Sequence, residues 1–263
     1  MYDFEFSKPS TIAEAVAALG HEGAQALGGG QTLLPTMKQR LAAPETLVSL
    51  TGIPEMKGVC LSDAGEVCIG GGTSHARVAA EAAAHYPALA SMAGRIGDPA
   101  VRNRGTIGGS LANNDPSACY PAAVLGSGAT VRTNTRDIAA DDFFDGMFTT
   151  ALEEGEIITE VRFPVPEKAS YQKFIQPASR FALVGVFVAK FADGVRVAVT
   201  GASSDGVFRW TEAEEALNGS FSADALADVA PPSGDMISDL HGSGAYRAHL
   251  VKVMTGRAVA AAS

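Results

Sequence analysis

The most informative stretch of this sequence reads Arg102-Asn103-Arg104-Gly105-Thr106-Ile107-Gly108-Gly109-Ser110-Leu111-Ala112-Asn113-Asn114-Asp115-Pro116. Two arginines, paired glycines and short polar side chains make poor material for a hydrophobic core. They suit a loop whose backbone N–H groups approach an anion closely, because glycine has no Cβ to block the approach. Arg102 and Arg104 are interpreted as solvent-facing residues outside the site. The stretch therefore predicts an anion-binding loop.

A second glycine loop, Gly28-Gly29-Gly30, follows a predicted strand from Ala24 to Leu27 and precedes a predicted helix that begins at Leu33. Free N–H groups and the dipole at a helix N-terminus stabilise a pyrophosphate. The loop does not fit G-x-G-x-x-G and lacks the acidic residue of a Rossmann site. Paired loops suit a long phosphorylated ligand such as FAD, and the alternative is two unrelated turns. A third triplet, Gly70-Gly71-Gly72, is expected only to turn a hairpin into the next helix.

Composition excludes several classes of protein. The chain has 263 residues, is 46% hydrophobic and carries a net charge of −9, which argues against a nucleic-acid or anionic-membrane binder. The start lacks a signal-peptide pattern and no apolar run reaches spanning length, so we expect a cytoplasmic protein without an integral membrane segment. Cys60, Cys68 and Cys119 show no C-x-x-C spacing and are expected to be buried free thiols.

Helical and extended segments are interleaved along the chain, which predicts an α+β protein. Helices are expected at 12–19, 74–85, 87–95, 116–125, 211–217, 222–229 and 244–254. Strands are expected at 24–27, 46–50, 59–61, 67–69, 130–133, 155–164, 184–191 and 195–200. The sequence Pro164-Val165-Pro166 predicts a linker, so we place one domain at 1–166 and a second at 167–263.

No catalytic residue or metal site emerges from the pattern of reactive side chains. The five histidines show neither H-x-x-x-H nor H-E-x-x-H spacing, and Ser203-Ser204-Asp205 lacks the G-x-S-x-G context of a nucleophile. A chain with a cofactor cradle but no evident acid, base or nucleophile indicates that the cofactor performs the chemistry. Redox chemistry fits this pattern best.

Four segments carry a family resemblance: 28–35 (GGGQTLLP), 96–110 (IGDPAVRNRGTIGGS), 156–164 (EIITEVRFP) and 173–185 (KFIQPASRFALVG). Together they resemble the FAD-binding medium subunit of the molybdenum hydroxylases, the family of aerobic carbon monoxide dehydrogenase and xanthine dehydrogenase. The resemblance covers essentially the whole chain, in order. It implies a two-part FAD domain of the vanillyl-alcohol-oxidase (PCMH) type, divided near 53–58, followed by an α+β C-terminal domain of the carbon monoxide dehydrogenase flavoprotein type.

The resemblance also implies which residues hold FAD. They are the two glycine loops and several outlying positions: Ala26, Leu27, Gly28, Gly29, Gly30, Gln31, Thr32, Leu33, Ile96, Thr106, Ile107, Gly108, Gly109, Ser110, Asn113, Asp115, Cys119 and Ile158. Three positions depart from or vary within the family pattern. Cys119 stands where the family commonly has an aspartate, Ile175 where a basic residue is frequent, and Phe181 where some relatives place an aromatic over the flavin ring.

The implied function is electron transfer within a larger complex. A molybdenum subunit would oxidise the substrate, 2Fe-2S clusters in a small subunit would carry electrons, and FAD on this chain would pass them to NAD, a quinone or oxygen. The resemblance implies a dimer of heterotrimers, with neither molybdenum nor iron on this chain. Two alternatives remain open: a free-standing FAD-dependent oxidoreductase of the same fold, and a non-enzymatic assembly subunit.

Overall fold

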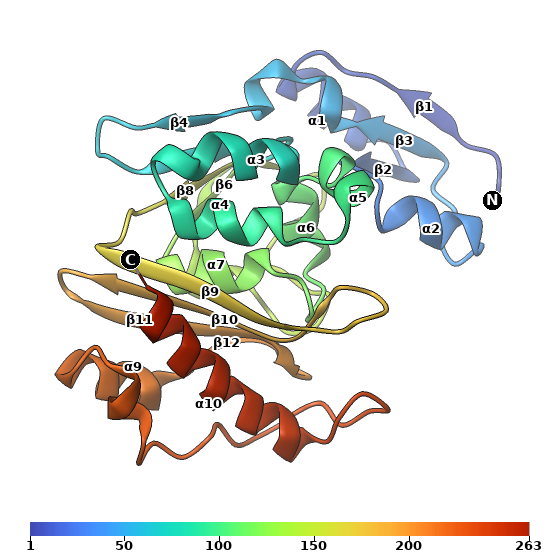
Figure 1. Ribbon diagram of the computed structural model, residues 1–263. Helices are drawn as coiled ribbons and strands as arrows, with labels where there is room; N and C mark the ends of the chain where they lie inside the picture. Colours follow the sequence, from blue (N-terminus) through green and yellow to red (C-terminus); the bar gives the residue numbers. More distant parts are fainter. Residues whose placement is uncertain (263) are drawn as a thin grey trace.

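The computed structural model describes residues 1–262, which form helices and three separate sheets. The first sheet lies in a lobe at the N-terminal end, the second lies in the middle, and the third separates two layers of helices (Figure 1). This arrangement confirms the predicted α+β class.

The N-terminal lobe contains a parallel sheet in the order β1-β3-β2. Its elements are β1 (Glu5–Ser7), α1 (Ile12–Leu19), β2 (Ala24–Leu27), α2 (Leu33–Lys38) and β3 (Thr46–Ser49). Helix α1 begins where predicted, directly after Thr11, whose side chain accepts from the Glu14 N–H at 3.2 Å. Strand β2 ends directly before the first glycine loop. The sheet therefore holds that loop at its carboxyl edge.

Two 3₁₀ turns (Leu50–Gly52 and Pro54–Met56) lead to an antiparallel sheet in the order β4-β5-β8-β6-β7. Its strands are β4 (Val59–Leu61), β5 (Val67–Gly70), β6 (Thr130–Thr133), β7 (Asp137–Ala139) and β8 (Ile158–Phe163). The helices of this part are α3 (His75–Glu81), α4 (Pro87–Gly94), α5 (Pro99–Arg104), α6 (Ile107–Asn113), α7 (Tyr120–Ser127) and α8 (Ala140–Phe143), with a 3₁₀ turn at Ala82–Ala84. The sheet and helices share one apolar core.

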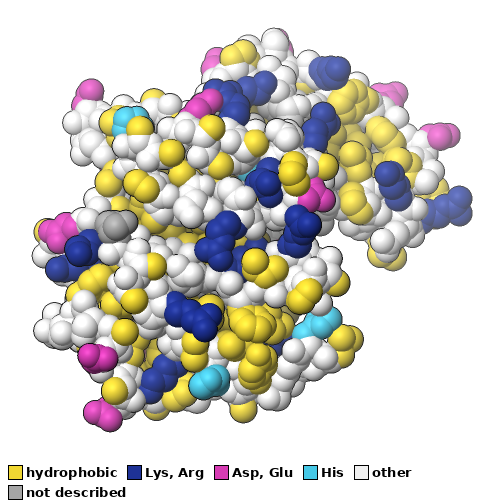
Figure 2. All heavy atoms as spheres, in the orientation of Figure 1, with side chains coloured by type: hydrophobic (Ala, Val, Ile, Leu, Met, Phe, Trp, Pro, Cys, Tyr) yellow, Lys and Arg dark blue, Asp and Glu magenta, His cyan; other side chains and the backbone are white. Residues whose placement is uncertain are grey.

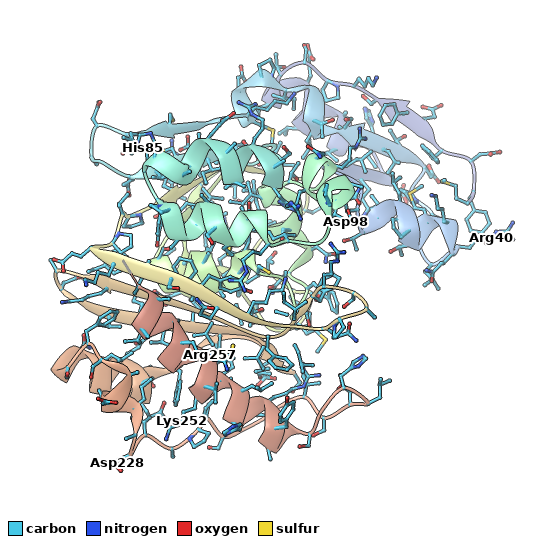
Figure 3. All side chains as sticks on the ribbon, in the orientation of Figure 1. Arg40, His85, Asp98, Asp228, Lys252 and Arg257 are labelled. Atoms are coloured by element: carbon cyan, nitrogen blue, oxygen red, sulfur yellow. The ribbon has the colours of Figure 1, made fainter. Side chains whose placement is uncertain are left out.

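The third sheet is antiparallel, in the order β12-β11-β10-β9. Its strands are β9 (Lys168–Ile175), β10 (Ala182–Phe191), β11 (Gly194–Ser203) and β12 (Gly206–Arg209), followed by α9 (Thr211–Gly219), a 3₁₀ turn (Ala223–Leu226) and α10 (Gly244–Ala261). Figure 1 shows α7 on one side of this sheet and α10 on the other. Lys252 and Arg257 project from α10 (Figure 3). No helix among residues 1–262 is long and apolar enough to cross a membrane.

Side chains alternate between the two faces of β10, as the period of a strand requires. Phe187 and Ala189 pack into the core that contains α7, whereas Val186 and Val188 pack with α10. The larger core thus includes side chains from both sides of residue 166. The domain boundary near Glu167 stays a prediction.

The structure corrects several sequence-based expectations. The stretch from Arg102 to Pro116 is largely helical, because Thr106 caps α6 and Asn114 ends it in a left-handed conformation. The predicted helix at 116–125 begins later, at Tyr120, and α10 continues past Met254 to Ala261. Cys60 is exposed, so the expectation that every cysteine is buried is wrong; Cys68 and Cys119 are buried and free.

Candidate cofactor-binding site

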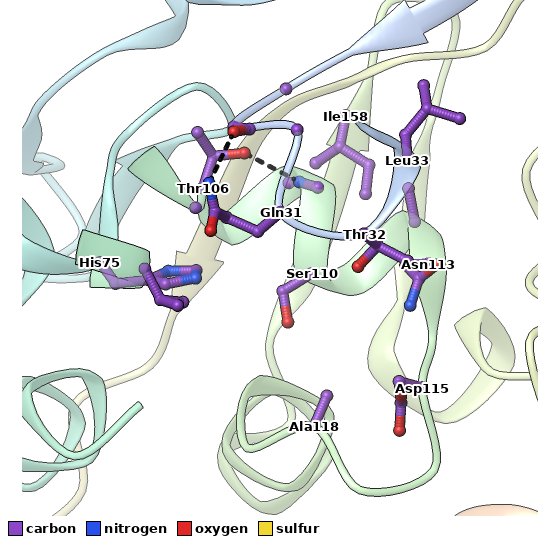
Figure 4. A pocket seen from close by; sticks show the side chains of 18 of the residues that line it. Gln31, Thr32, Leu33, His75, Thr106, Ser110, Asn113, Asp115, Ala118 and Ile158 are labelled. Atoms are coloured by element: carbon purple, nitrogen blue, oxygen red, sulfur yellow. Dashed lines mark hydrogen bonds between the residues drawn. The ribbon is translucent and has the colours of Figure 1, made fainter. Parts of the chain in front are cut away.

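A cavity of about 640 Å³ lies where the two glycine loops meet (Figure 4). Its volume falls within the range of about 300–1,000 Å³ that is typical of ligand sites. The N-terminal lobe supplies the first loop, the middle part supplies α6 and β8, and the third sheet supplies β9 with the loop that follows it. Segments from all three sheets therefore meet around one space.

The first glycine loop packs backbone to backbone against the second. A Cβ on Gly29 would overlap the Arg104 carbonyl group, and one on Gly28 would lie 2.9 Å from the Thr106 Oγ1 atom. Gly30 has a φ of +71°, a conformation that side chains disfavour. The three glycines are therefore required for the close approach of the two loops and for the turn, in addition to any contact with a ligand.

Backbone N–H groups of the first loop are free to bind a ligand. Among residues 1–262, those of Gly29, Gly30, Gln31 and Thr32 have no acceptor within the chain. The Gln31 side chain steadies the turn by donating from Nε2 to the Gly29 carbonyl oxygen at 3.3 Å. Since such groups must be satisfied by water or by a bound acceptor, this loop can receive an anion.

The second loop differs, because most of its N–H groups are already used inside the protein. The Gly108 N–H donates to Gly71 O at 2.9 Å, and the Gly109 N–H donates to Thr106 Oγ1 at 3.1 Å. This loop can contact a ligand through its side chains and its surface shape rather than through a series of free backbone N–H donors. Ser110 and Asn113 lie one turn apart on α6 and line the cavity together (Figure 4).

The third glycine triplet also belongs to the site, which sequence analysis did not expect. Gly71 and Gly72 line the cavity, and a Cβ on Gly108 would lie only 2.7 Å from Gly71 O. The triplet does turn β5 into the cap of α3, as predicted, because Ser74 accepts from the Arg77 N–H. Its second role depends on contacts with residues more than thirty positions away, which no local pattern reveals.

His75 is a buried imidazole in the cavity wall, 5% exposed. Its Nδ1 atom has no hydrogen-bond partner among the described residues, and its ring lies 5.3 Å from the Tyr120 ring. Burial, with a smaller effect from the Arg102 charge, lowers the pKa of His75 to about 4. The side chain is therefore neutral at physiological pH. In the sequence it is one of five scattered histidines without metal-ligand spacing.

Two further polar groups line the far part of the cavity. Lys173 is 7% exposed, and its Nζ donates to Arg95 O at 3.2 Å and to Cys119 Sγ at 3.5 Å. Asp115 accepts from the Ser117 N–H at 2.8 Å, although burial outweighs this bond and raises the pKa of its carboxyl group. Lys173 and Asp115 thus place an ammonium group and a carboxyl group in the cavity wall from segments far apart in sequence.

The structure brings the predicted site residues together with one exception. Those that line the cavity are Ala26, Leu27, Gly28, Gly29, Gly30, Gln31, Thr32, Leu33, Ile96, Thr106, Gly108, Gly109, Ser110, Asn113, Asp115, Cys119 and Ile158. Ile107 does not, because its side chain is fully buried in the core and its N–H donates to Thr73 O. Arg102 and Arg104 lie outside the lining as well, and Arg102 donates to Ile96 O at 3.0 Å. Lining residues absent from the prediction include Gly71, His75, Ser117, Glu156, Lys173 and Arg180.

Residues 2–166 match the family model described as the FAD binding domain in molybdopterin dehydrogenase. The chain belongs to this family. FAD as the cofactor and the predicted class, an oxidoreductase flavoprotein, are thereby confirmed. The first glycine loop fits the pyrophosphate of FAD, since it lines the cavity and the N–H groups of residues 29–32 have no acceptor among residues 1–262.

Two sequence relatives extend the similarity of this FAD-binding family member over nearly the full chain. The nicotine 6-hydroxylase medium subunit of Paenarthrobacter nicotinovorans is 34% identical, and the alignment covers 97% of this chain and 95% of that one. The carbon monoxide dehydrogenase medium chain of Hydrogenophaga pseudoflava is 34% identical, with 98% and 96% covered.

Solved structures agree with the sequence matches. Carbon monoxide dehydrogenase from Hydrogenophaga pseudoflava superimposes with a TM-score of 0.89 at 34% identity, covering 99% of this chain and 97% of that chain. Quinoline 2-oxidoreductase from Pseudomonas putida 86 gives a TM-score of 0.89 at 29% identity, with 98% and 96% covered. The similarity therefore includes the C-terminal part as well as residues 2–166, which confirms the expected flavoprotein fold.

Proposed function

We propose that this chain is the electron-transfer subunit of a multi-subunit molybdenum hydroxylase. It would receive electrons from 2Fe-2S clusters on a small partner subunit and deliver them to an external acceptor. The observation that carries the proposal is the nearly full-length match to medium subunits of such enzymes, combined with a cavity that offers free backbone N–H groups. Bound FAD supplies both one-electron and two-electron chemistry, which joins clusters to acceptors such as NAD.

The residues of this chain would bind, orient and shield the cofactor. The N–H groups of Gly29, Gly30, Gln31 and Thr32 would hold the pyrophosphate, where oxygen atoms can accept from them. Ser110 and Asn113, on the face of α6 that lines the cavity, would orient the polar groups of FAD next to the pyrophosphate. Apolar side chains, Ile96 and Ile158 among them, would exclude water from the remainder of the cavity.

Lys173 would set the electrostatic environment at the far end of the cavity. Its ammonium group lies beside a thiol and a carbonyl oxygen, and it forms no ion pair with a carboxylate among residues 1–262. A buried cation favours added negative charge nearby, so it would stabilise the reduced form of a cofactor that gains electrons. The external acceptor would be NAD, a quinone or oxygen, and the cavity walls do not select among the three.

The proposed assembly is a dimer of heterotrimers with a large molybdenum-binding subunit and a small iron–sulfur subunit. Apolar side chains gather over the N-terminal lobe in Figure 2, and Tyr2, Phe4, Phe6 and Leu41 are exposed there. Exposed apolar patches frequently mark surfaces that contact another protein. This exposed apolar surface therefore supports the proposal that the chain binds an obligate partner subunit.

Isolation of the chain with its natural partners tests the proposal. We expect a flavin spectrum from the complex, bleached when the molybdenum subunit's substrate is added and restored by an electron acceptor. A chain that retains flavin but purifies alone, with its own substrate turnover, would support the free-standing oxidoreductase. Partners without any bound flavin would support the assembly subunit. Either result would overturn the proposal.

A further inference from the structure

Two of the three cysteines pair across two neighbouring strands, and neither of them lines the cavity. Cys60 in the edge strand β4 is directly opposite Cys68 in β5. Residues that pair across an antiparallel ladder project to the same face of the sheet, so the two thiols are neighbours. The predicted strands at 59–61 and 67–69 each centre on one of these cysteines, and the observed register pairs them.

The ladder geometry places the two backbones within reach of a disulfide. The Gly70 N–H donates to Gly58 O at 3.0 Å, and the Ser62 N–H donates to Glu66 O at 2.9 Å, two residues to either side of the cysteine pair. Cys60 and Cys68 therefore occupy a hydrogen-bonded pair, for which the Cα atoms lie about 5.5 Å apart. Disulfides join residues whose Cα atoms are about 4.4–6.8 Å apart.

The two thiols differ in accessibility. Cys60 is exposed, whereas Cys68 is 5% exposed. Burial raises the pKa of the Cys68 thiol; the Glu160, Cys60 and Glu66 charges act in the same direction, and Arg162 opposes them. A dissolved reagent therefore meets Cys60 first, and Cys68 can react only with a mixed disulfide that has formed on Cys60.

We propose that Cys60 and Cys68 form a reversible dithiol–disulfide site that reacts with small soluble disulfides of the glutathione disulfide class. The Cys60 thiolate attacks one sulfur of the reagent, whose S–S bond breaks and releases one thiolate. The Cys68 thiol then loses its proton and attacks the Cys60 sulfur, which releases the second reagent thiolate. The cysteine pair loses two electrons and two protons, and the reagent disulfide becomes two thiols.

This site lies next to the cavity wall. Strand β5 ends at Gly70, the first glycine of the third triplet, and the N–H of Gly58, which directly precedes β4, donates to Thr73 Oγ1 at 2.9 Å. A bond between Cys60 and Cys68 would tie the edge strand β4 to β5 beside these contacts. We therefore expect the oxidised form to slow amide hydrogen exchange in residues 58–70.

Thiol titration and peptide mapping of the full chain test the proposal. After treatment of the reduced protein with glutathione disulfide, we expect the free thiols to fall from three to one, with a Cys60–Cys68 crosslink and Cys119 still reduced. Dithiothreitol should restore all three. The variant Cys68→Ser should stop at a glutathione adduct on Cys60, and Cys60→Ser should remain unmodified.

Two results would overturn the proposal. One is a wild-type protein that stops at the Cys60 adduct, because Cys68 then fails to attack. The other is a Cys60–Cys60 bond between two chains with Cys68 left reduced. Neither outcome depends on flavin content, so failure here is distinguishable from failure of the electron-transfer proposal.

Discussion

Gly29 joins the two glycine loops, because no side chain fits between it and the Arg104 carbonyl group. We predict that Gly29→Ala separates the loops and weakens FAD retention at least tenfold, an estimate that corresponds to about 1.4 kcal/mol of binding free energy. FAD titration of the apoprotein, followed by fluorescence quenching, measures the change. Gly219→Ala is the matched control, because a Cβ there meets no atom within 4 Å. Equal affinity of a folded Gly29→Ala variant would contradict the role assigned to this glycine.

His75 makes the stability of the protein depend on pH. Its pKa is about 4 in the folded state and about 6.5 when unfolded, so protonation favours the unfolded chain. The stabilisation is complete above about pH 6.5 and is lost as the pH falls toward 4, by at most about 1.4 kcal/mol per pH unit.

Urea unfolding at several pH values tests this prediction. We expect His75→Gln to flatten the fall in unfolding free energy between about pH 6.5 and 4 relative to the wild type. The control His85→Gln removes an exposed imidazole, labelled in Figure 3. It shows how far the loss of any histidine changes the unfolding free energy. Parallel curves for wild type and His75→Gln would show that His75 carries no such linkage.

At the scale of elements, short polar caps fix where α3, α5 and α6 begin. Thr106 accepts from the Gly109 N–H at 3.1 Å and also lines the cavity. We predict that Thr106→Ala destabilises the protein by about 1 kcal/mol, whereas Thr106→Ser, which keeps the oxygen, loses much less. Urea unfolding of both variants measures the difference. If the two variants lose equal stability, the methyl group rather than the cap is responsible.

Helix ends were harder to predict than helix starts. Thr11 and Ser74 cap helices that the sequence pattern predicts, whereas the helix capped by Thr106 was expected to be a loop. Helix α10 ends far beyond the expected Met254 because Ala258 and Val259 pack into the core of the third sheet. Tertiary packing, which extends a helix wherever it buries apolar surface, thus decided this boundary.

At the scale of the whole molecule, the third sheet completes the core beneath α7. Every residue of α7 is buried, and Phe187 and Ala198 from the third sheet join the same core. We predict that residues 1–166 expressed alone expose this helix and form aggregates that bind ANS. Size-exclusion chromatography and ANS fluorescence, with the full chain as the control, check the expectation. A soluble monomer that retains FAD would instead establish 1–166 as an independently folding domain.

The sequence by itself determined the α+β class, the order of most elements, the family and the two glycine loops. These features rest on short patterns: hydrophobic period, caps, turns and motifs within about fifteen residues of one another. Only the tertiary structure placed Gly71, His75 and Lys173 in the cavity wall. The physical reason is that such contacts join segments distant in sequence, and they depend on strand register and layer packing, which no local pattern specifies.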